Sequence, residues 1–191
     1  MAGQPPPLWG WHRLERSWAD TLVADARVRP GDLVVDVGAG SGVIVDALLA
    51  AGASVIAVEL HPERAHQLRV RYDPRRVTVV RADASDLRLP RRPYLVVANP
   101  PFAPLKPLLG RLLAPGSRLT GAVLVVPRHV ARQWTGPDAP ARPRWSHDFM
   151  VARGRAVPRH AFRPAPPKDA VTLSIRRRFD ARPGVDGRSW S

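Results

Sequence analysis

Short apolar runs alternate with amphipathic stretches along most of this 191-residue chain. Five runs have the length and composition of strands, at residues 33–37, 54–60, 77–82, 94–98 and 119–126. Stretches with helical spacing lie between or after them, at residues 43–51, 62–72, 104–113 and 128–134. Repeated strand–helix–strand units with nearly continuous apolar strands predict an α/β fold, in which helices cover both faces of a mostly parallel sheet.

The two ends of the chain complete this plan. Apolar residues recur with helical spacing over residues 14–28, which predicts a first helix. Residues 149–157 and 171–177 are a candidate final antiparallel pair, which would bring the sheet to seven strands. We expect an N-terminal arm at 1–13, a catalytic domain at 14–178, a proline-rich loop at 136–146 and a disordered tail at 179–191.

Four residues that suit ligand binding lie at the carboxyl ends of four different predicted strands: Gly38, Glu59, Asp83 and Asn99. In sheets of this kind, ligands bind at the carboxyl ends of the strands. Because the four residues fall at one edge of one sheet, together they are more informative than any one of them. This edge is therefore the predicted site.

The first of these strands runs into a loop that contains Gly38, Gly40 and Gly42. Such a tight turn needs glycine for positive φ and for close backbone approach to a ligand. Val43 stands where a dinucleotide fingerprint would place its third glycine, so S-adenosylmethionine fits better than NAD. Glu59 could accept hydrogen bonds from the ribose hydroxyls, and Asp83 from the adenine amino group. The alternatives are a simple tight turn, an exposed strand-end charge and a helix or turn cap.

The strongest signal is Asn99-Pro100-Pro101-Phe102. The exocyclic amino nitrogen of a purine is a poor nucleophile, because its lone pair is delocalised into the ring. Two acceptors, the Asn99 side-chain oxygen and the Pro100 carbonyl, can hold both of its N–H groups while prolines stiffen the loop. Phe102 can stack on a base that has left its helix. Asn99, Pro100 and Phe102 are the predicted catalytic residues of an amino-group methyltransferase, and Asn99 is also a predicted cofactor-binding residue.

Charge and composition narrow the partners. The net charge is +14, and residues 127–191 carry 14 Lys or Arg against 5 Asp or Glu, whereas residues 1–126 carry 16 against 11. This excess predicts attraction to nucleic acid, although codon bias toward arginine would give a similar composition. Arg176, Arg177 and Arg178 are candidate RNA contacts, or else a solvated strand end.

Other classes of protein are disfavoured by what the sequence does not contain. It has no cysteine, no apolar run of the roughly 20 residues that span a bilayer, and no histidines with metal-ligand spacing. We therefore expect a cytoplasmic protein that binds neither metal nor membrane.

With these motifs assembled, residues 9–178 resemble the Erm-type rRNA adenine N6-methyltransferases, especially the short actinobacterial members. The resemblance rests on the loop at 36–42, Glu59, Asp83, the motif at 99–102 and the proline loop that begins at Phe162. It implies a class I S-adenosylmethionine-dependent methyltransferase fold. It also implies methylation of one adenine in the peptidyl-transferase region of 23S rRNA, and resistance to macrolide, lincosamide and streptogramin B drugs.

The resemblance carries further expectations and two departures. His12 and Leu14 match positions that touch the cofactor in the family. Proline at position 100 departs from the family's usual isoleucine or leucine and occurs in DNA and protein-glutamine methyltransferases. The family's helical C-terminal domain is expected to be absent. We expect a monomer that acts on 23S rRNA before ribosome assembly is complete.

Two other functions stay open at this point. One is methylation of DNA adenine or of a protein glutamine, which the charge and the lack of a target-recognition domain disfavour. The other is a non-catalytic RNA-binding module that keeps a relict cofactor pocket.

Overall fold

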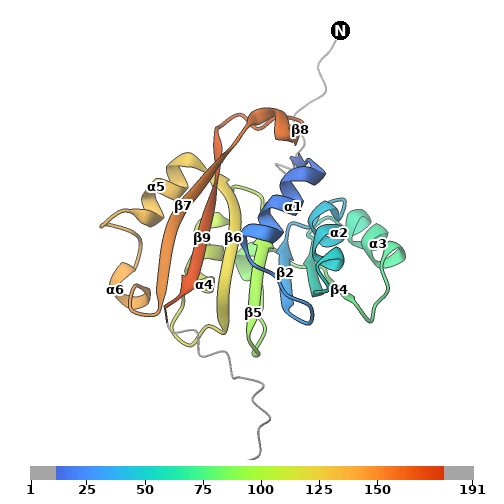
Figure 1. Ribbon diagram of the computed structural model, residues 1–191, viewed down its shortest axis with the longest axis horizontal. Helices are drawn as coiled ribbons and strands as arrows, with labels where there is room; N and C mark the ends of the chain where they lie inside the picture. The colour runs from blue at the N-terminus through green and yellow to red at the C-terminus, as the bar shows by residue number, and fades with distance from the viewer. Residues whose placement is uncertain (1–11, 179–191) are drawn as a thin grey trace, which may run out of the picture.

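A computed structural model describes residues 12–178, and its main sheet has seven strands in the order β4-β3-β2-β5-β6-β9-β7 (Figure 1). In that order the strands span Val77–Val80, Ser54–Val58, Leu33–Val37, Tyr94–Ala98, Leu119–Pro127, Ala170–Arg177 and Phe149–Val157. Neighbouring strands from β4 to β6 are parallel, whereas β9 is antiparallel to both β6 and β7. The prediction of a mostly parallel seven-stranded sheet is confirmed.

Helices cover both faces of this sheet, as the apolar pattern of the strands predicted. Strand β2 is buried along its whole length because its side chains alternate between two cores. Val34 packs with the core beneath α1, α2 and α3, whereas Val35 packs with the core beneath α4, α5 and α6. The helices of the first face span Arg16–Asp25, Val43–Ala50 and Pro62–Arg71, and those of the second span Leu105–Leu112, Arg128–Thr135 and Arg142–Trp145.

The helix expected at 14–28 spans Arg16–Asp25, so that prediction was wrong at both ends. Arg13–Leu14 forms strand β1, which pairs antiparallel with strand β8, Phe162–Arg163. The Glu15 amide extends the pairing by donating to the Ala161 carbonyl at 2.8 Å. Leu14 and Phe162 are buried in the same core. Apolar spacing cannot reveal this arrangement, because it depends on a segment about 150 residues away.

A second difference lies in the proline-rich segment 136–146, which was expected to be a loop but contains the short helix α6. Its Trp145 packs against Trp134 of α5, with ring centroids 6.3 Å apart, and donates to the Pro140 carbonyl at 2.8 Å. Two tryptophans thus close the outer end of the second core.

Some expectations concern residues that the structure does not describe. The tail at 179–191 and all but the last two residues of the arm at 1–13 lie outside the described range. Within residues 12–178, no helix is long and apolar enough to cross a membrane. The same range contains no group of three or more His, Cys, Asp or Glu side chains that could hold a metal ion.

Candidate active site

A cleft of about 630 Å³ opens at the carboxyl ends of the central strands. Seven of the predicted site residues line it: His12, Gly38, Glu59, Asp83, Asn99, Pro100 and Phe102. Strands β3 and β4 end at Val58 and Val80, two residues before their predicted ends. Glu59 and Asp83 therefore lie in the connections beyond the strands, where their side chains reach the cleft.

The glycine loop and the Asn-Pro-Pro-Phe loop pack directly against each other. Gly38 has φ +80°, and a Cβ at this position would lie 2.8 Å from the Pro101 side chain. Its amide and that of Ala39 both donate to the Val58 carbonyl, at 2.8 and 2.9 Å. Glycine is required at position 38 for two reasons, its left-handed backbone and the close approach of Pro101.

The other two glycines shape the loop without lining the cleft. The Gly40 amide donates to Glu59 Oε2 at 2.8 Å. Gly42 has φ +84° and is the N-cap of α2, and a Cβ there would collide with the hydroxyl of Tyr72. Leu14 is also outside the cleft lining, because its side chain is buried in the core. Direct cofactor contact by these three residues stays a prediction.

Glu59 is 3% exposed, and backbone amides fix its carboxylate in place. Oε2 accepts from Gly40, while Oε1 accepts from the His61 amide at 2.8 Å and from Arg64 at 3.1 Å. An ionised carboxylate offers about four acceptor positions. With three occupied, Glu59 can accept one ribose hydroxyl as it stands, and a second if the Arg64 contact gives way.

Asp83 caps the short 3-10 helix η1 at Ala84–Asp86, as the alternative interpretation of this residue proposed. Its Oδ1 accepts from both the amide and the hydroxyl of Ser85, at 2.7 and 2.8 Å. The hydrogen bond from the Ser85 amide, together with the one from its hydroxyl, lowers the pKa of Asp83. The carboxylate also lines the cleft, so capping and recognition of an adenine amino group are compatible.

The Asn99 amide is oriented by the N-terminal arm. Its Nδ2 donates to the His12 carbonyl at 2.7 Å. Because a carbonyl can only accept, the nitrogen must occupy this end of the amide, and Oδ1 is left as the acceptor. No residue within 12–178 donates a hydrogen bond to Oδ1. The sequence identified Asn99 but gave no sign of the contact that orients it.

His12 connects the N-terminal arm, the Asn-Pro-Pro-Phe loop and the proline loop that begins at Phe162. Its Nδ1 donates to the Pro164 carbonyl at 2.9 Å, and its ring lies 6.2 Å from that of Phe102 at an interplanar angle of 37°. The β1–β8 pairing holds the same two segments together. Pro167, farther along the proline loop, lines the cleft as well. The arm and this loop thus complete the wall of the site around Asn99.

Asp36 is a site residue that sequence reasoning did not single out. It is 1% exposed, neither carboxylate oxygen accepts a hydrogen bond from residues 12–178, and burial, then the charge of Glu59, raises its pKa well above the ordinary value. The side chain lines a small hollow with Gly38 and Asn99, next to the cleft. Burying an unpaired carboxyl is costly, so this end of the site is suited to a cationic ligand group that would pair with it. The acidic residue of the 36–42 motif was the available signal.

The residues present therefore fit S-adenosylmethionine. Asp36 is suited to its ammonium group, Glu59 to its ribose and Asp83 to the adenine amino group. The glycine loop leaves room for close approach, and Asn99 faces the position where a methyl acceptor would lie.

The three predicted RNA contacts lie near the amino ends of the parallel strands, on the side of the sheet that is opposite the cleft. Arg176 is exposed and pairs with Gly121 near the start of β6, whereas the site-facing end of β9 is Ala170, opposite Pro127. Arg177 donates to the Leu119 and Ser117 carbonyls and stacks over a phenylalanine ring, and Arg178 donates to Ser146. Two of the three arginines thus stabilise the strand end, and RNA contact by this triplet stays a prediction.

Comparison with known proteins agrees with this geometry. The family model described as ribosomal RNA adenine dimethylase matches residues 14–191. The ribosomal RNA small subunit methyltransferase A of Thermosynechococcus vestitus is 34% identical over 87% of this chain and 66% of its own length. The mycinamicin-resistance protein MyrB of Micromonospora griseorubida is 38% identical over 76% of this chain and 47% of its own length.

Among solved structures, the 23S rRNA methyltransferase ErmE matches with a TM-score of 0.74 and 25% identity, over 88% of this chain and 70% of that one. The chain thus spans about half to two thirds of the length of these two curated relatives. The family match covers nearly the whole chain, and the fold agrees with it. The chain belongs to the ribosomal RNA adenine dimethylase family.

Proposed function

We propose that the protein transfers a methyl group from S-adenosylmethionine to N6 of an adenine in rRNA. The observation that carries the proposal is the oriented amide of Asn99, whose Nδ2 is held by His12 and whose Oδ1 remains available beside Pro100 and Phe102. An amide fixed in this way can accept from an amino group without reorganising, which is the basis of electrostatic preorganisation.

The chain's own residues would act by positioning the base. Asn99 Oδ1 and the Pro100 carbonyl accept from the two N–H groups of the adenine, so that the nitrogen becomes more pyramidal and its lone pair less delocalised. Phe102 stacks on the flipped base, with His12 next to it. S-adenosylmethionine, when bound, would supply an activated methyl group for transfer to N6, with S-adenosylhomocysteine as the leaving group. The N6 proton becomes acidic in that step and passes to solvent, so no strong general base is required.

The finer target that we propose is an adenine in the peptidyl-transferase region of 23S rRNA, methylated in the cytoplasm by a monomer before ribosome assembly is complete. Methylation there would confer macrolide, lincosamide and streptogramin B resistance. Similarity to MyrB and to ErmE supports this choice. A second candidate is an adenine of small-subunit rRNA, because the Thermosynechococcus relative is named for the small subunit and matches more of this chain than MyrB does.

Labelling identifies the substrate. The protein is incubated with S-adenosylmethionine carrying a labelled methyl group and with protein-free 23S rRNA, protein-free 16S rRNA or duplex DNA. The modified base is then mapped by nuclease digestion and mass spectrometry. We expect N6-methyladenine in the peptidyl-transferase region of 23S rRNA. Label confined to 16S rRNA assigns the second candidate, and label on DNA alone or on no nucleic acid refutes rRNA methylation.

Drug resistance is tested separately in cells. Expression in a macrolide-sensitive strain should raise the inhibitory concentrations of macrolide, lincosamide and streptogramin B drugs together, while an Asn99→Ala variant should not. Equal sensitivity of the two strains, with 23S rRNA methylated in one of them, would separate the chemistry from a role in resistance.

A further inference from the structure

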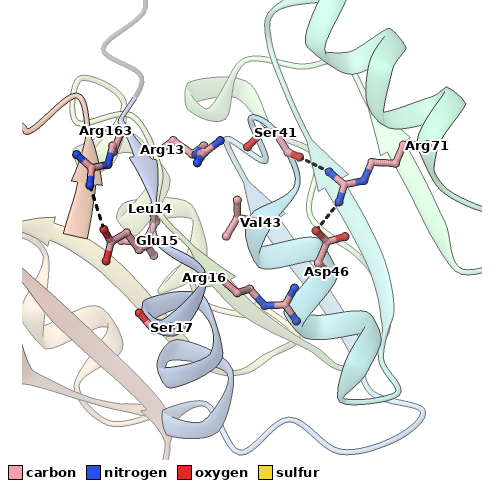
Figure 2. Close-up of a pocket in the computed structure, with 10 residues that line it drawn as sticks. All are labelled: Arg13, Leu14, Glu15, Arg16, Ser17, Ser41, Val43, Asp46, Arg71 and Arg163. Atoms are coloured by element: carbon pink, nitrogen blue, oxygen red, sulfur yellow. Dashed lines mark hydrogen bonds and ion pairs between the residues drawn. The ribbon is translucent and has the colours of Figure 1, made fainter. Parts of the chain in front are cut away.

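A second cleft, of about 600 Å³, opens beside the candidate active site and is lined by arginines from four separate elements. Arg13 comes from β1, Arg16 from the start of α1, Arg71 from the end of α3 and Arg163 from β8. Figure 2 shows these side chains around Val43, which follows the glycine loop. We call this set of four residues the arginine cleft.

The four guanidinium groups differ in how far they are already paired. Arg71 donates to the Ser41 carbonyl and pairs with Asp46 at 2.6 Å, and Arg16 pairs with Asp20 at 3.0 Å. Arg163 has only a long contact with Glu15, at 3.8 Å, and its side chain is 76% exposed. The Arg13 guanidinium makes no hydrogen bond or ion pair with any residue of the described range. Two arginines therefore retain most of their hydrogen-bonding capacity.

These two arginines also stand directly opposite each other. Arg13 and Arg163 are register partners in the antiparallel β1–β8 pair, so their side chains leave the same face of the ribbon. Like charges in this arrangement destabilise a strand pair. An anion bound between them would offset that repulsion. The planar donor fork of arginine matches a phosphate group particularly well.

The arginine cleft lies close to the chemistry. Arg13 follows His12, whose carbonyl orients Asn99, and Arg163 precedes Pro164, which accepts from the His12 ring. The small hollow that contains Asp36 shares residues with both clefts and lies between them. An RNA strand that delivers a base to Asn99 would therefore bring its neighbouring phosphates near Arg13 and Arg163.

We propose that the arginine cleft binds backbone phosphodiester groups of the RNA next to the flipped adenine, with Arg13 and Arg163 as the principal ligands. This inference rests on the proposed function, because it requires RNA as the substrate. Such contacts position the strand and carry no sequence information. These phosphate contacts would lie beside the cleft, at the carboxyl ends of the parallel strands. Arg176 lies at the opposite ends of the strands.

The test compares the Arg13→Gln/Arg163→Gln double variant with a control of equal charge, Arg75→Gln/Arg92→Gln. The control residues are exposed and precede β4 and β5, so they lie at the amino ends of these strands, away from the cleft. The dissociation constant of a labelled RNA hairpin, chosen because the parent protein methylates it, is measured against salt concentration. Removing one arginine–phosphate interaction lowers the slope of log affinity against log salt by about 0.7–0.9.

We expect the slope to fall by about 1–2 in the Arg13→Gln/Arg163→Gln variant and by less than half of that in the control. The single variant Arg163→Gln should give an intermediate slope. A slope equal to that of the control overturns the inference.

Two further readouts identify other outcomes. Affinity for S-adenosylmethionine, measured by calorimetry, should be unchanged, and a loss of it would assign the arginine cleft to the cofactor carboxylate and overturn the inference. The melting temperature of the double variant should not fall, because the substitutions relieve a like-charge pair. An unchanged melting temperature shows that weaker RNA binding is not caused by misfolding. If the parent protein methylates no RNA, the proposed function fails first, and that failure is separate from an unchanged slope in an active enzyme.

Discussion

Asn99 and Asp36 line the same small hollow, but within the described residues only the Asn99 side chain has a hydrogen-bond partner. The Asn99 amide is held by a backbone carbonyl, whereas Asp36 accepts nothing from the described residues. The first arrangement suits a group that must keep its orientation during a reaction. The second suits a carboxyl group whose partner is a cationic group of a bound ligand. Asn99 could be predicted from its motif. The lack of hydrogen-bond partners at Asp36 could not, because it depends on how the loops at 38–42 and 99–102 pack around that side chain.

Substitution of Asn99 tests the two-acceptor mechanism. Asn99→Ala removes Oδ1, and loss of one preorganised hydrogen-bonding group costs about 10²–10³ in kcat. Affinity for S-adenosylmethionine should stay largely intact, because the other residues suited to the cofactor are unchanged. Single-turnover methylation and calorimetry measure the two effects.

Asn99→Asp is the informative companion. It keeps an acceptor but places a carboxylate oxygen against the His12 carbonyl, so we expect a loss of rate from misorientation. The control is Gln133→Ala, which removes an exposed side-chain amide from α5. Near-parental turnover by Asn99→Ala would contradict the mechanism.

Asp36→Asn should stabilise the cofactor-free protein and weaken the binding of S-adenosylmethionine. Burial raises the pKa of Asp36, so the folded state keeps its carboxyl protonated at pH values where the unfolded chain ionises. The parent is therefore not penalised below pH 3.8, the ordinary carboxyl value, and loses stability relative to the variant as pH rises above it. At pH 7 we therefore expect the variant to have the higher free energy of unfolding.

Urea unfolding at several pH values measures this difference, with the exposed Asp138→Asn as control. A gap between parent and Asp36→Asn that does not change with pH would mean that the carboxyl is not held protonated by burial.

Individual elements were predicted well where local pattern determines them. Strands β2, β5 and β7 have the predicted bounds, and β2 and β5 are apolar runs that end in turn signals. Strands β1 and β8 were missed, because two residues carry no periodicity and the pairing joins distant segments. The proline loop that begins at Phe162 could be predicted beside the site, but its pairing with the N-terminal arm could not. The contact between the two motif loops, at Gly38 and Pro101, is likewise a property of packing.

Gly38→Ala tests that contact, and Gly31→Ala provides a matched control. Both glycines have positive φ, +80° and +84°, so alanine at either costs about 1–2 kcal/mol of backbone strain. A Cβ at Gly31 meets nothing within 4 Å, whereas one at Gly38 lies 2.8 Å from Pro101. We expect similar losses of stability from strain, with a further loss for Gly38→Ala and a marked loss of turnover in that variant alone. Thermal unfolding and methylation assays measure the effects, and equal turnover in the two variants would show that the loops are not coupled.

At the scale of the whole molecule, the direction of β9 decides where the basic triplet Arg176, Arg177 and Arg178 lies. Composition predicted a polyanionic partner, but it could not show which edge of the sheet would carry the charge. Because β9 is antiparallel to β6, its Ala170 end lies at the catalytic edge and Arg176 lies at the other. Part of the arginine excess is also structural, since Arg177 holds two carbonyls and covers the Phe149 ring with its guanidinium carbon 4.5 Å from the ring centroid.

Arg176→Gln and Arg177→Gln separate these two uses of charge. Arg177→Gln removes two hydrogen bonds and a cation–π contact at a half-buried site, so we expect it to lower the free energy of unfolding by about 1–3 kcal/mol. Arg176→Gln, at an exposed position, should change stability by less than about 0.5 kcal/mol. If the far edge also contacts RNA, as the charge pattern predicts, Arg176→Gln should still flatten the salt dependence of RNA binding by about 0.7–0.9. Urea unfolding and salt titrations of RNA binding measure both properties on the same preparations. An unchanged salt slope in Arg176→Gln would confine phosphate recognition to the catalytic edge, because the protein would then keep its basic far edge without using it to hold RNA.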